Sequence, residues 1–190
     1  MKKQPITTAR TKQNIIDAFW ELYETKRIEK ITIKDITLKA GYNRGTFYEY
    51  FVDVYDVLEH IENSLIVKLQ ELTPNDVPVG EPFPFEILIS MFTEYRKYFI
   101  VLLGDNGNPS FLSKVKKSFK PQIKLKLTAL GVKDDFELDY TLEYTLSALI
   151  GVLDYWFRQE NPPELEQLMG LIHEISEMGV MTKIKKAGHE

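Results

Sequence analysis

The sequence predicts an all-α protein with a small N-terminal head, residues 1–52, and a larger helical domain, residues 53–190. Apolar residues recur at helical spacing along most of the chain, and no stretch of useful length alternates like a strand. Residues 1–52 carry ten Lys/Arg against six Asp/Glu, a balance of +4 in a chain of net charge −4, which leaves −8 for the rest. A basic head suits a polyanion, although a mildly basic N-terminus is also common without such a partner.

The composition is typical of a soluble globular protein. With 190 residues and 44% hydrophobic content, the chain is long enough to bury a core. It contains no cysteine, which excludes disulfides, thiolate zinc sites and a cysteine nucleophile. No apolar run reaches the roughly 18 residues that a membrane-spanning helix needs, and no apolar segment follows the basic N-terminus. We therefore expect a cytoplasmic protein without a membrane partner.

The first two helices of the head follow from spacing and capping signals. A first helix is predicted over roughly residues 11–25, because four apolar residues fall on one face: Ile15, Phe19, Leu22 and Tyr23. Thr32 begins a short second helix, where its hydroxyl and the side chain of Asp35 form a capping box. Gly41 ends this helix, because glycine tolerates the positive φ of a tight turn.

A third short helix is predicted directly after the turn. Asn43 is a good N-cap for it. Phe47 and Phe51 stand four residues apart on that helix and are expected to point into a small apolar core. Two short helices joined by a tight turn and held against a longer one form a helix-turn-helix unit, in which the last helix is free to enter a groove.

The exposed side of the third helix carries groups suited to DNA. Arg44 can donate to a guanine edge or to a phosphate, Gly45 permits close approach of the backbone, and Thr46 can meet a phosphate or a thymine methyl group. Tyr48 and Tyr50 point away from the inward pair, and a phenol hydroxyl is a suitable phosphate donor. Alternatively, aromatic residues of a short helix are core residues, but two more inward rings would overfill so small a head.

The run ITIKDITLKAGYNRGTFYEYFVDVYDVL, Ile31 to Leu58, resembles the DNA-binding signature of the TetR family of bacterial transcriptional regulators. It matches the pattern I-T-x-x-x-I-x-x-x-A-G-x-x-x-G-T-x-Y-x-Y-F. The resemblance implies groove or phosphate contacts for Thr32 and Lys34, a reading role for Asn43, Arg44, Gly45 and Thr46, and backbone contacts for Tyr48 and Tyr50. It also implies that residues 53–190 form a regulatory, ligand-binding and dimerisation domain.

The sequence departs from the family pattern at two positions. Tyr42 stands where a small aliphatic residue is usual, and Val54 stands where a lysine usually adds a phosphate contact at the start of the fourth helix. Glu49 places a negative charge on the recognition helix, where it either accepts from a cytosine or faces solvent. These departures leave open an alternative function, a coactivator or adaptor of the same fold that acts mainly through protein contacts.

Further helices are predicted after the head. Asp53 is a plausible N-cap for a helix that reaches about Leu72, with five apolar residues at helical spacing: Val57, Leu58, Ile61, Leu65 and Leu69. Residues 73–85 contain four prolines and are predicted to form a loop. Other helices are expected over 85–103, over a basic segment that Pro121 must kink or divide, over about 136–158 and over about 163–180.

The last two helices carry more apolar surface than one core requires. One apolar set comprises Leu138, Leu142, Thr145, Leu146, Leu149, Val152, Leu153 and Trp156, with Ala148 and Gly151 permitting close helix approach. The other comprises Leu165, Leu168, Met169, Ile172, Ile175 and Met178. The surplus predicts a homodimer in which two helices from each subunit form a four-helix interface, as the resemblance also implies. The alternative is that these faces pack only within one chain.

The C-terminal segments LLGDNGNPSFLSKVKK and ALIGVLDYWFRQENPPELEQL resemble a subset of the family related to dihydroxyacetone-kinase-operon regulators. The family at large binds a small molecule in this domain, which implies an effector of unknown identity. The candidate lining residues are Met91, Phe92, Tyr95, Phe99, Phe119, Tyr144, Tyr155 and Trp156. Aromatic residues at helical spacing are also typical of an ordinary core.

Enzyme chemistry has little support. The three histidines form no recognisable triad, and the chain has neither a glycine-rich phosphate loop nor a metal-ligand spacing, so no catalytic, metal or cofactor residue is predicted. The helix-turn-helix head and the family resemblance together imply a homodimeric DNA-binding transcriptional regulator, a repressor of a near-palindromic operator in double-stranded DNA, modulated by a small molecule. A helical binding protein or enzyme with a vestigial head is the remaining alternative, and it predicts no salt-sensitive DNA affinity.

Overall fold

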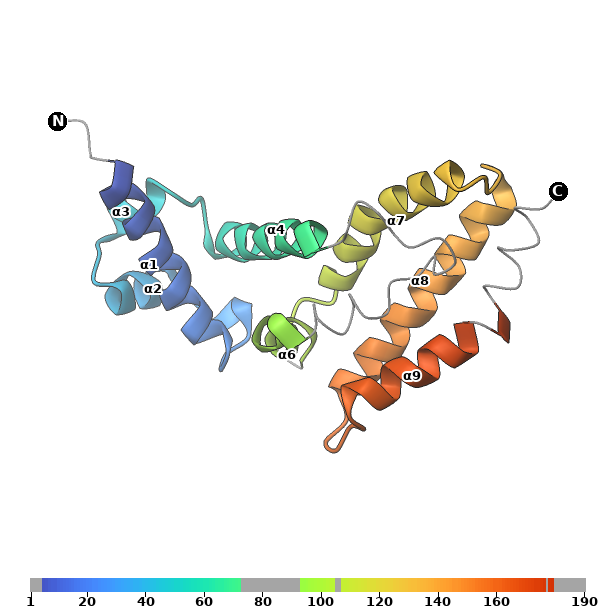
Figure 1. The fold of residues 1–190 in the computed structure, drawn as a ribbon. Helices are drawn as coiled ribbons and strands as arrows, with labels where there is room; N and C mark the ends of the chain where they lie inside the picture. The colour runs from blue at the N-terminus through green and yellow to red at the C-terminus, as the bar shows by residue number, and fades with distance from the viewer. Residues whose placement is uncertain (1–4, 73–92, 105–106, 177, 180–190) are drawn as a thin grey trace. The chain divides into compact units, whose positions relative to one another are not determined.

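The computed structural model describes residues 5–72, 93–104, 107–176 and 178–179. Within them all regular structure is helical, which confirms the predicted all-α class (Figure 1). The elements are α1 (Pro5–Tyr23), η1 (Ile28–Lys30), α2 (Ile33–Ala40), α3 (Arg44–Tyr48), α4 (Val54–Leu72), α6 (Arg96–Leu103), α7 (Phe111–Ala129), α8 (Phe136–Phe157) and α9 (Leu165–Ser176). The contacts divide the chain into two compact units, one comprising essentially the residues up to Val67 and the other the residues from Lys68 onward. The predicted functional division after residue 52 remains a prediction.

The first helix is longer at its N-terminus than the prediction of 11–25. It begins at Pro5, a residue favoured at the first helical position because its missing N–H is not needed there. The predicted start was too late because the first turns carry little apolar periodicity to detect. The helix ends at Tyr23, and the Thr25 hydroxyl then donates to the carbonyl of Leu22.

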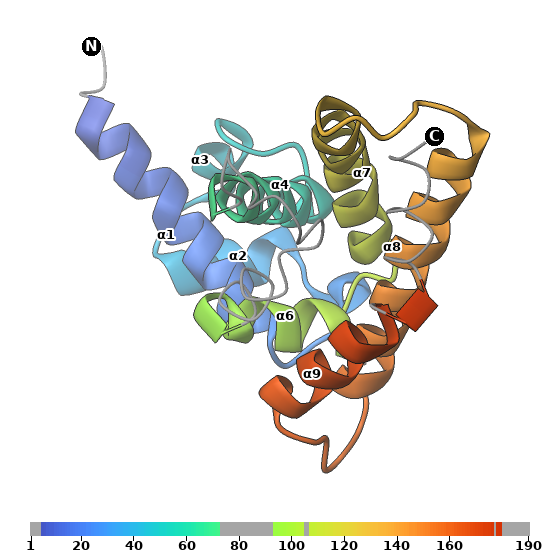
Figure 2. The same cartoon turned by 45° about the vertical axis from the view of Figure 1, so that its right-hand side comes forward.

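The head is built on α1. Helix α2 packs against it, and the two cross closely in Figure 2. The predicted inward pair Phe47 and Phe51 is buried, but Phe51 lies beyond the end of α3 rather than on it. The other main core residues are Ile15, Phe19, Tyr23, Ile36, Val57, Leu58 and Ile61.

Helix α4 begins where it was predicted to begin. Asp53 Oδ1 accepts from the backbone N–H of Asp56 at 2.9 Å, as an N-cap should, and the helix runs to Leu72. All five apolar residues predicted to face inward from it are buried.

Burial raises the pKa of Tyr23, at the end of α1, to about 12. The charges of Glu62 and Glu29 add to this rise, so the Tyr23 hydroxyl stays protonated.

In the C-terminal unit, α7 and α8 lie side by side (Figure 2). Pro121 was expected either to kink or to divide helix α7. The helix continues through it, so the expected division does not occur. Asp135 caps α8 by accepting from the backbone N–H groups of Glu137 and Leu138. At the turn between the two helices a small apolar cluster comprises Leu127, Val132, Leu138 and Leu142, with Ile123 packed against it. The predicted helix over 85–103 is described only from residue 93, and α9 begins two residues after its predicted start.

Ion pairs join α7 and α8 along the rest of their contact. The Glu143 carboxylate of α8 accepts from Lys116 and Lys120 of α7, the latter at 2.9 Å. One turn further along α7, Lys124 contacts Asp134 and Asp139 at 2.7 and 3.0 Å. Hydrogen bonds from Lys116 and Lys120 lower the pKa of Glu143 from 4.5 to about 2.

This lowered pKa predicts an acid-sensitive contact between α7 and α8. A carboxyl whose pKa is lower in the folded state stabilises that state above its ordinary pKa, and the contribution is lost as the pH falls from about 4.5 to about 2. We expect Glu143→Gln to be less stable than the wild type at neutral pH and to lose less further stability on acidification. Urea unfolding at several pH values measures this, with Glu160→Gln, at an exposed position, as the control. Identical pH profiles for Glu143→Gln and the wild type would contradict the prediction.

Candidate nucleic-acid interface

The start of α2 is fixed by a reciprocal capping box. The Thr32 hydroxyl accepts from the backbone N–H of Asp35 at 3.2 Å, while Asp35 Oδ2 accepts from the backbone N–H of Thr32 at 3.1 Å. The Thr32 hydroxyl also donates to Asp35 Oδ2 at 2.7 Å. These bonds lower the pKa of Asp35, and the nearby charges of Lys26 and Lys34 lower it further. The predicted capping box is confirmed, and the Thr32 hydroxyl proton is engaged by Asp35, although a groove or phosphate contact is also predicted for Thr32.

The turn after α2 has the predicted geometry. Gly41 adopts φ +74°, a left-handed conformation that side chains disfavour. The following residue, Tyr42, donates its backbone N–H to the carbonyl of Thr37 at 2.9 Å and so closes the end of the helix. The chain thereby turns sharply and delivers residue 43 to the start of α3.

The first turn of helix α3 is stabilised by a side-chain cap. Asn43 Oδ1 accepts from the backbone N–H of Thr46 at 2.9 Å, as predicted for an N-cap. A β-carbon at position 45 would lie 3.1 Å from this oxygen, so Gly45 makes room for the cap. This local role of Gly45 is additional to the predicted close approach of the backbone to DNA. Because the side-chain oxygen of Asn43 caps the helix, its amide nitrogen is the group that remains for a contact with a base.

Residues 42–51, here called the recognition segment, differ sharply in exposure from one residue to the next. Phe47 is completely buried, whereas the adjacent Tyr48 is 58% exposed. Arg44, one turn before Tyr48, is also exposed, and Thr46 and Tyr50 are partly exposed. The fold therefore brings most of the predicted reading residues together on one capped turn of helix. The remaining predicted contact residues, Thr32 and Lys34, are exposed at the first turn of α2.

The start of α4 is acidic, and two carboxylates there accept hydrogen bonds from nearby backbone N–H groups. Asp56 Oδ2 accepts from the backbone N–H of Val52 at 2.8 Å, in addition to the cap that Asp53 provides. A helix N-terminus binds phosphate through free backbone donors and positive potential, and here two carboxylates occupy that position. Val54, at the departure from the family pattern, therefore stands between the Asp53 and Asp56 carboxylates at this helix start.

Sequence reasoning missed two contacts from α1 to the ends of the recognition segment. Asn14 Nδ2 donates to the Tyr42 hydroxyl at 2.9 Å, and Lys12 Nζ lies 5.4 Å from the centre of the Phe51 ring. Tyr42 departs from the family pattern, but nothing local in the sequence identifies its partner 28 residues away. These contacts place α1 against the turn as well as against the core.

The candidate ligand residues are only partly brought together. Phe99 is buried and stacks on Phe157 at 6.3 Å, and Trp156 contacts the same ring at 4.8 Å. Tyr95 and Phe119 are half-buried. Tyr144 and Tyr155 instead lie on the surface, 69% and 68% exposed, because α8 buries its leucines and turns these tyrosines outward. Met91 and Phe92 lie outside the described residues.

The described part of the chain contains neither a membrane-spanning helix nor a cluster of metal ligands. No described helix is long and apolar enough to cross a membrane. Among the same residues, no group of three or more His, Asp or Glu side chains is placed to hold a metal ion.

An all-helical chain with a capped helix-turn-helix head has the architecture of a DNA-binding transcriptional regulator. A model of the TetR-type family, described as a transcriptional regulator C-terminal region, matches residues 84–178, which is half of the sequence. The chain belongs to the TetR family of transcriptional regulators. No curated protein matches it closely enough to count as a relative.

Two solved structures share the fold. A TetR transcriptional regulator from Streptococcus agalactiae 2603V is 23% identical with a TM-score of 0.66, covering 89% of this chain and 94% of its own. A structure titled dihydroxyacetone kinase operon activator DhaS is 19% identical with a TM-score of 0.63, covering 94% and 98%. At these identities the similarity establishes the fold alone.

Proposed function

We propose that this regulator is a cytoplasmic homodimeric repressor that binds a near-palindromic operator in double-stranded DNA and responds to a small-molecule effector. The observation that carries the DNA-binding proposal is the division of α3 into a buried and an exposed side. Phe47 anchors the helix in the core, while Arg44 and Tyr48 are exposed to solvent. Such a helix can enter the major groove without disturbing the packing that holds it.

Each residue has a distinct role in the proposed complex. Arg44 donates to a guanine edge, where a bidentate contact discriminates best between bases. Lys34, Tyr48 and Tyr50 donate to phosphates, and Thr46 contacts a phosphate or a thymine methyl group. Thr32 and Asn43 act mainly on the backbone, because their side chains cap the starts of α2 and α3. Gly45 acts in the same way, because its missing side chain leaves room for the Asn43 cap.

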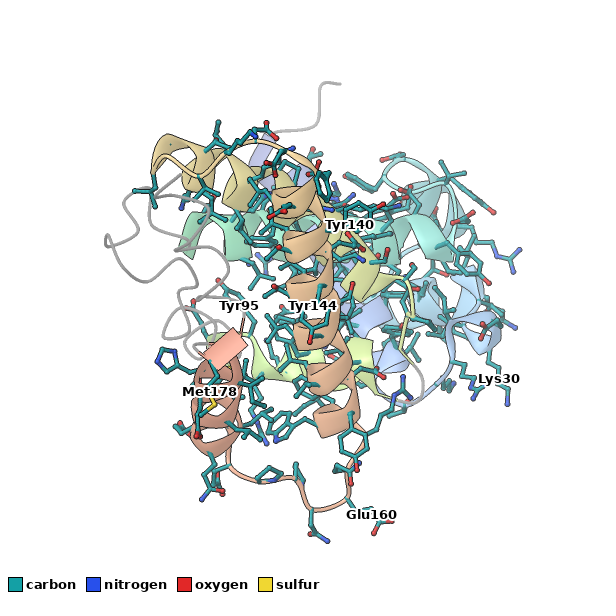
Figure 3. All side chains as sticks on the ribbon, turned by 90° about the vertical axis from the view of Figure 1, so that its right-hand side faces the viewer. Lys30, Tyr95, Tyr140, Tyr144, Glu160 and Met178 are labelled. Carbon is teal, nitrogen blue, oxygen red and sulfur yellow. The ribbon has the colours of Figure 1, made fainter. Side chains whose placement is uncertain are left out.

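The proposed dimer uses the outer sides of α8 and α9. Opposite its buried leucines, α8 exposes Phe136, Tyr140, Tyr144, Val152 and Tyr155. Figure 3 shows Tyr140 and Tyr144 projecting from the same side of α8. Leu171 and Ile175 are exposed on α9, and Met178 beyond its end. Large apolar residues repeated along two neighbouring helices exceed the scattered exposure of a monomer surface and support a two-fold interface with a second copy.

We expect a charge on this surface to separate the subunits. Ile175→Glu places a carboxylate where 62% of an isoleucine is exposed, so burial against a second copy would require an unpaired charge to be desolvated. Sedimentation velocity at micromolar concentration should show a dimer for the wild type and a monomer for the variant. Leu125→Glu is the matched control, because Leu125 is 72% exposed on α7 and should leave the dimer intact. A monomeric wild type would contradict the proposal.

The effector is proposed to bind in the C-terminal unit among the aromatic residues that the fold brings together. Phe99, Phe157 and Trp156 form a connected aromatic group that joins α6 to the end of α8. A ligand that changes the distance between the two recognition helices of a dimer would change its affinity for two half-sites about one DNA turn, ~34 Å, apart.

The proposed DNA binding is tested by selecting duplexes from a randomised library at two salt concentrations. Enrichment of a near-palindrome, with affinity falling steeply as salt rises, is the expected result. No enrichment at either salt would contradict the proposal and favour the alternative adaptor function. The proposed repression is tested with a reporter gene placed behind the selected operator. Expression of the reporter should rise when the gene for the regulator is deleted.

A further inference from the structure

The recognition helix cannot set its own direction. Helix α3 contains five residues, far fewer than an isolated helix needs to be stable, so its orientation depends on tertiary contacts. Phe47 fixes its depth in the core, but one buried ring leaves the helix free to pivot about it. Contacts at its two ends are therefore the ones that decide where Arg44 and Tyr48 point.

The entry to α3 is held from α1. Tyr42 directly precedes the N-cap residue, and its hydroxyl accepts from Asn14 Nδ2 at 2.9 Å in a partly buried position. The backbone N–H of the same tyrosine donates to the carbonyl of Thr37 at 2.9 Å. Side chain and main chain of Tyr42 are thus fixed by different helices, the first by α1 and the second by α2.

The exit from α3 is also held from α1. Phe51 follows the helix, and Lys12 Nζ lies 5.4 Å from the centre of its ring. His60 of α4 meets the same ring edge-on at 5.8 Å, and burial together with the charge of Lys12 lowers the pKa of this histidine. Two residues of one short stretch of α1, Lys12 and Asn14, therefore contact the two ends of the recognition segment.

We infer that Asn14 and Tyr42 are positioning residues for DNA readout: their hydrogen bond sets the orientation of α3 and hence the reach of Arg44 into the groove. This inference rests on the proposed DNA-binding function. A large side chain replaces the usual small aliphatic one at position 42, so that the hydroxyl spans from the turn to α1. The bond acts on binding without either residue needing to touch DNA.

The test is a double-mutant cycle on operator affinity with Tyr42→Phe, Asn14→Ala and the double variant. The probes are the near-palindromic duplex selected by the wild type and a scrambled duplex of the same length. Each single variant should bind the selected duplex roughly three- to tenfold more weakly, the double variant should be no weaker than either, and affinity for the scrambled duplex should be unchanged. Gln13→Ala is the matched control, because Gln13 bonds only to Asp17 within α1 in the described contacts.

The outcomes separate positioning from other roles. A bond that serves only stability would leave affinity unchanged well below the melting temperature, because the loss of one hydrogen bond leaves such a protein almost wholly folded. Equal affinities for all variants would therefore overturn the inference while leaving DNA binding intact. A loss with Tyr42→Phe but none with Asn14→Ala would also overturn it, since Tyr42 would then contact DNA directly. Failure of the wild type to select any duplex would overturn the proposed function itself.

Discussion

Arg44→Ala is expected to bind the selected operator roughly ten- to hundredfold more weakly than the wild type, with its sequence preference relaxed at the base pair that Arg44 reads. Arg44 is exposed at the first turn of α3, so its removal should leave the packing of the head unchanged. A base contact contributes only at the right sequence, whereas a phosphate contact contributes at every sequence. Affinity for a scrambled duplex should consequently fall much less.

The measurement is a titration of both duplexes at two salt concentrations. Arg158→Ala is the matched control: it also removes one exposed guanidinium, but from the end of α8, where Arg158 pairs with Asp154 at 3.1 Å. If Arg44→Ala weakens binding to the two duplexes equally, Arg44 contacts only phosphate, and the reading role belongs to other residues. Unchanged binding to both would show that α3 does not enter the groove at all.

Phe47→Ala should have the largest effect on stability of any change in the recognition segment. Its ring is completely buried and packs edge-on against Tyr48 and at 5.9 Å from Phe51. Removing a buried phenylalanine ring costs about 3–5 kcal/mol, because apolar contact is lost and a cavity is left. That is a large part of the stability of a small helical head, so we expect the head to be partly unfolded at physiological temperature.

The neighbouring substitution Tyr48→Ala should have the opposite signature. Tyr48 is exposed, so its removal should change stability by less than about 1 kcal/mol. Operator binding should nevertheless weaken, since a proposed phosphate contact is lost. The chain has two tryptophans, Trp20 in the head and Trp156 in α8. In a Trp156→Phe background, unfolding detected by tryptophan fluorescence therefore reports on the head alone. Equal stability losses for Phe47→Ala and Tyr48→Ala would contradict the assignment of buried and exposed sides.

The local features of the head could be predicted from the sequence because each depends on residues close together in the chain. The capping box joins Thr32 to Asp35, three residues away, and the cap of α3 joins Asn43 to Thr46. The positive φ of Gly41 is a property of one residue in one turn. The four-residue spacing of Phe47 and Phe51 likewise predicted that both rings are buried, although the helix itself ends before the second.

Other features required the tertiary structure, because they depend on the angle and register at which helices pack. All eight candidate ligand residues are plausible from composition, yet α8 turns Tyr144 and Tyr155 to the surface, since its five buried leucines occupy the inner side. In the same way, the turn at Gly41 and the exposed position of Arg44 follow from neighbouring residues, but only the packing of α1 brings Asn14 to Tyr42. Capping and periodicity depend on residues within about one helical turn. A contact between residues 28 apart forms only when two helices pack at a particular angle and register.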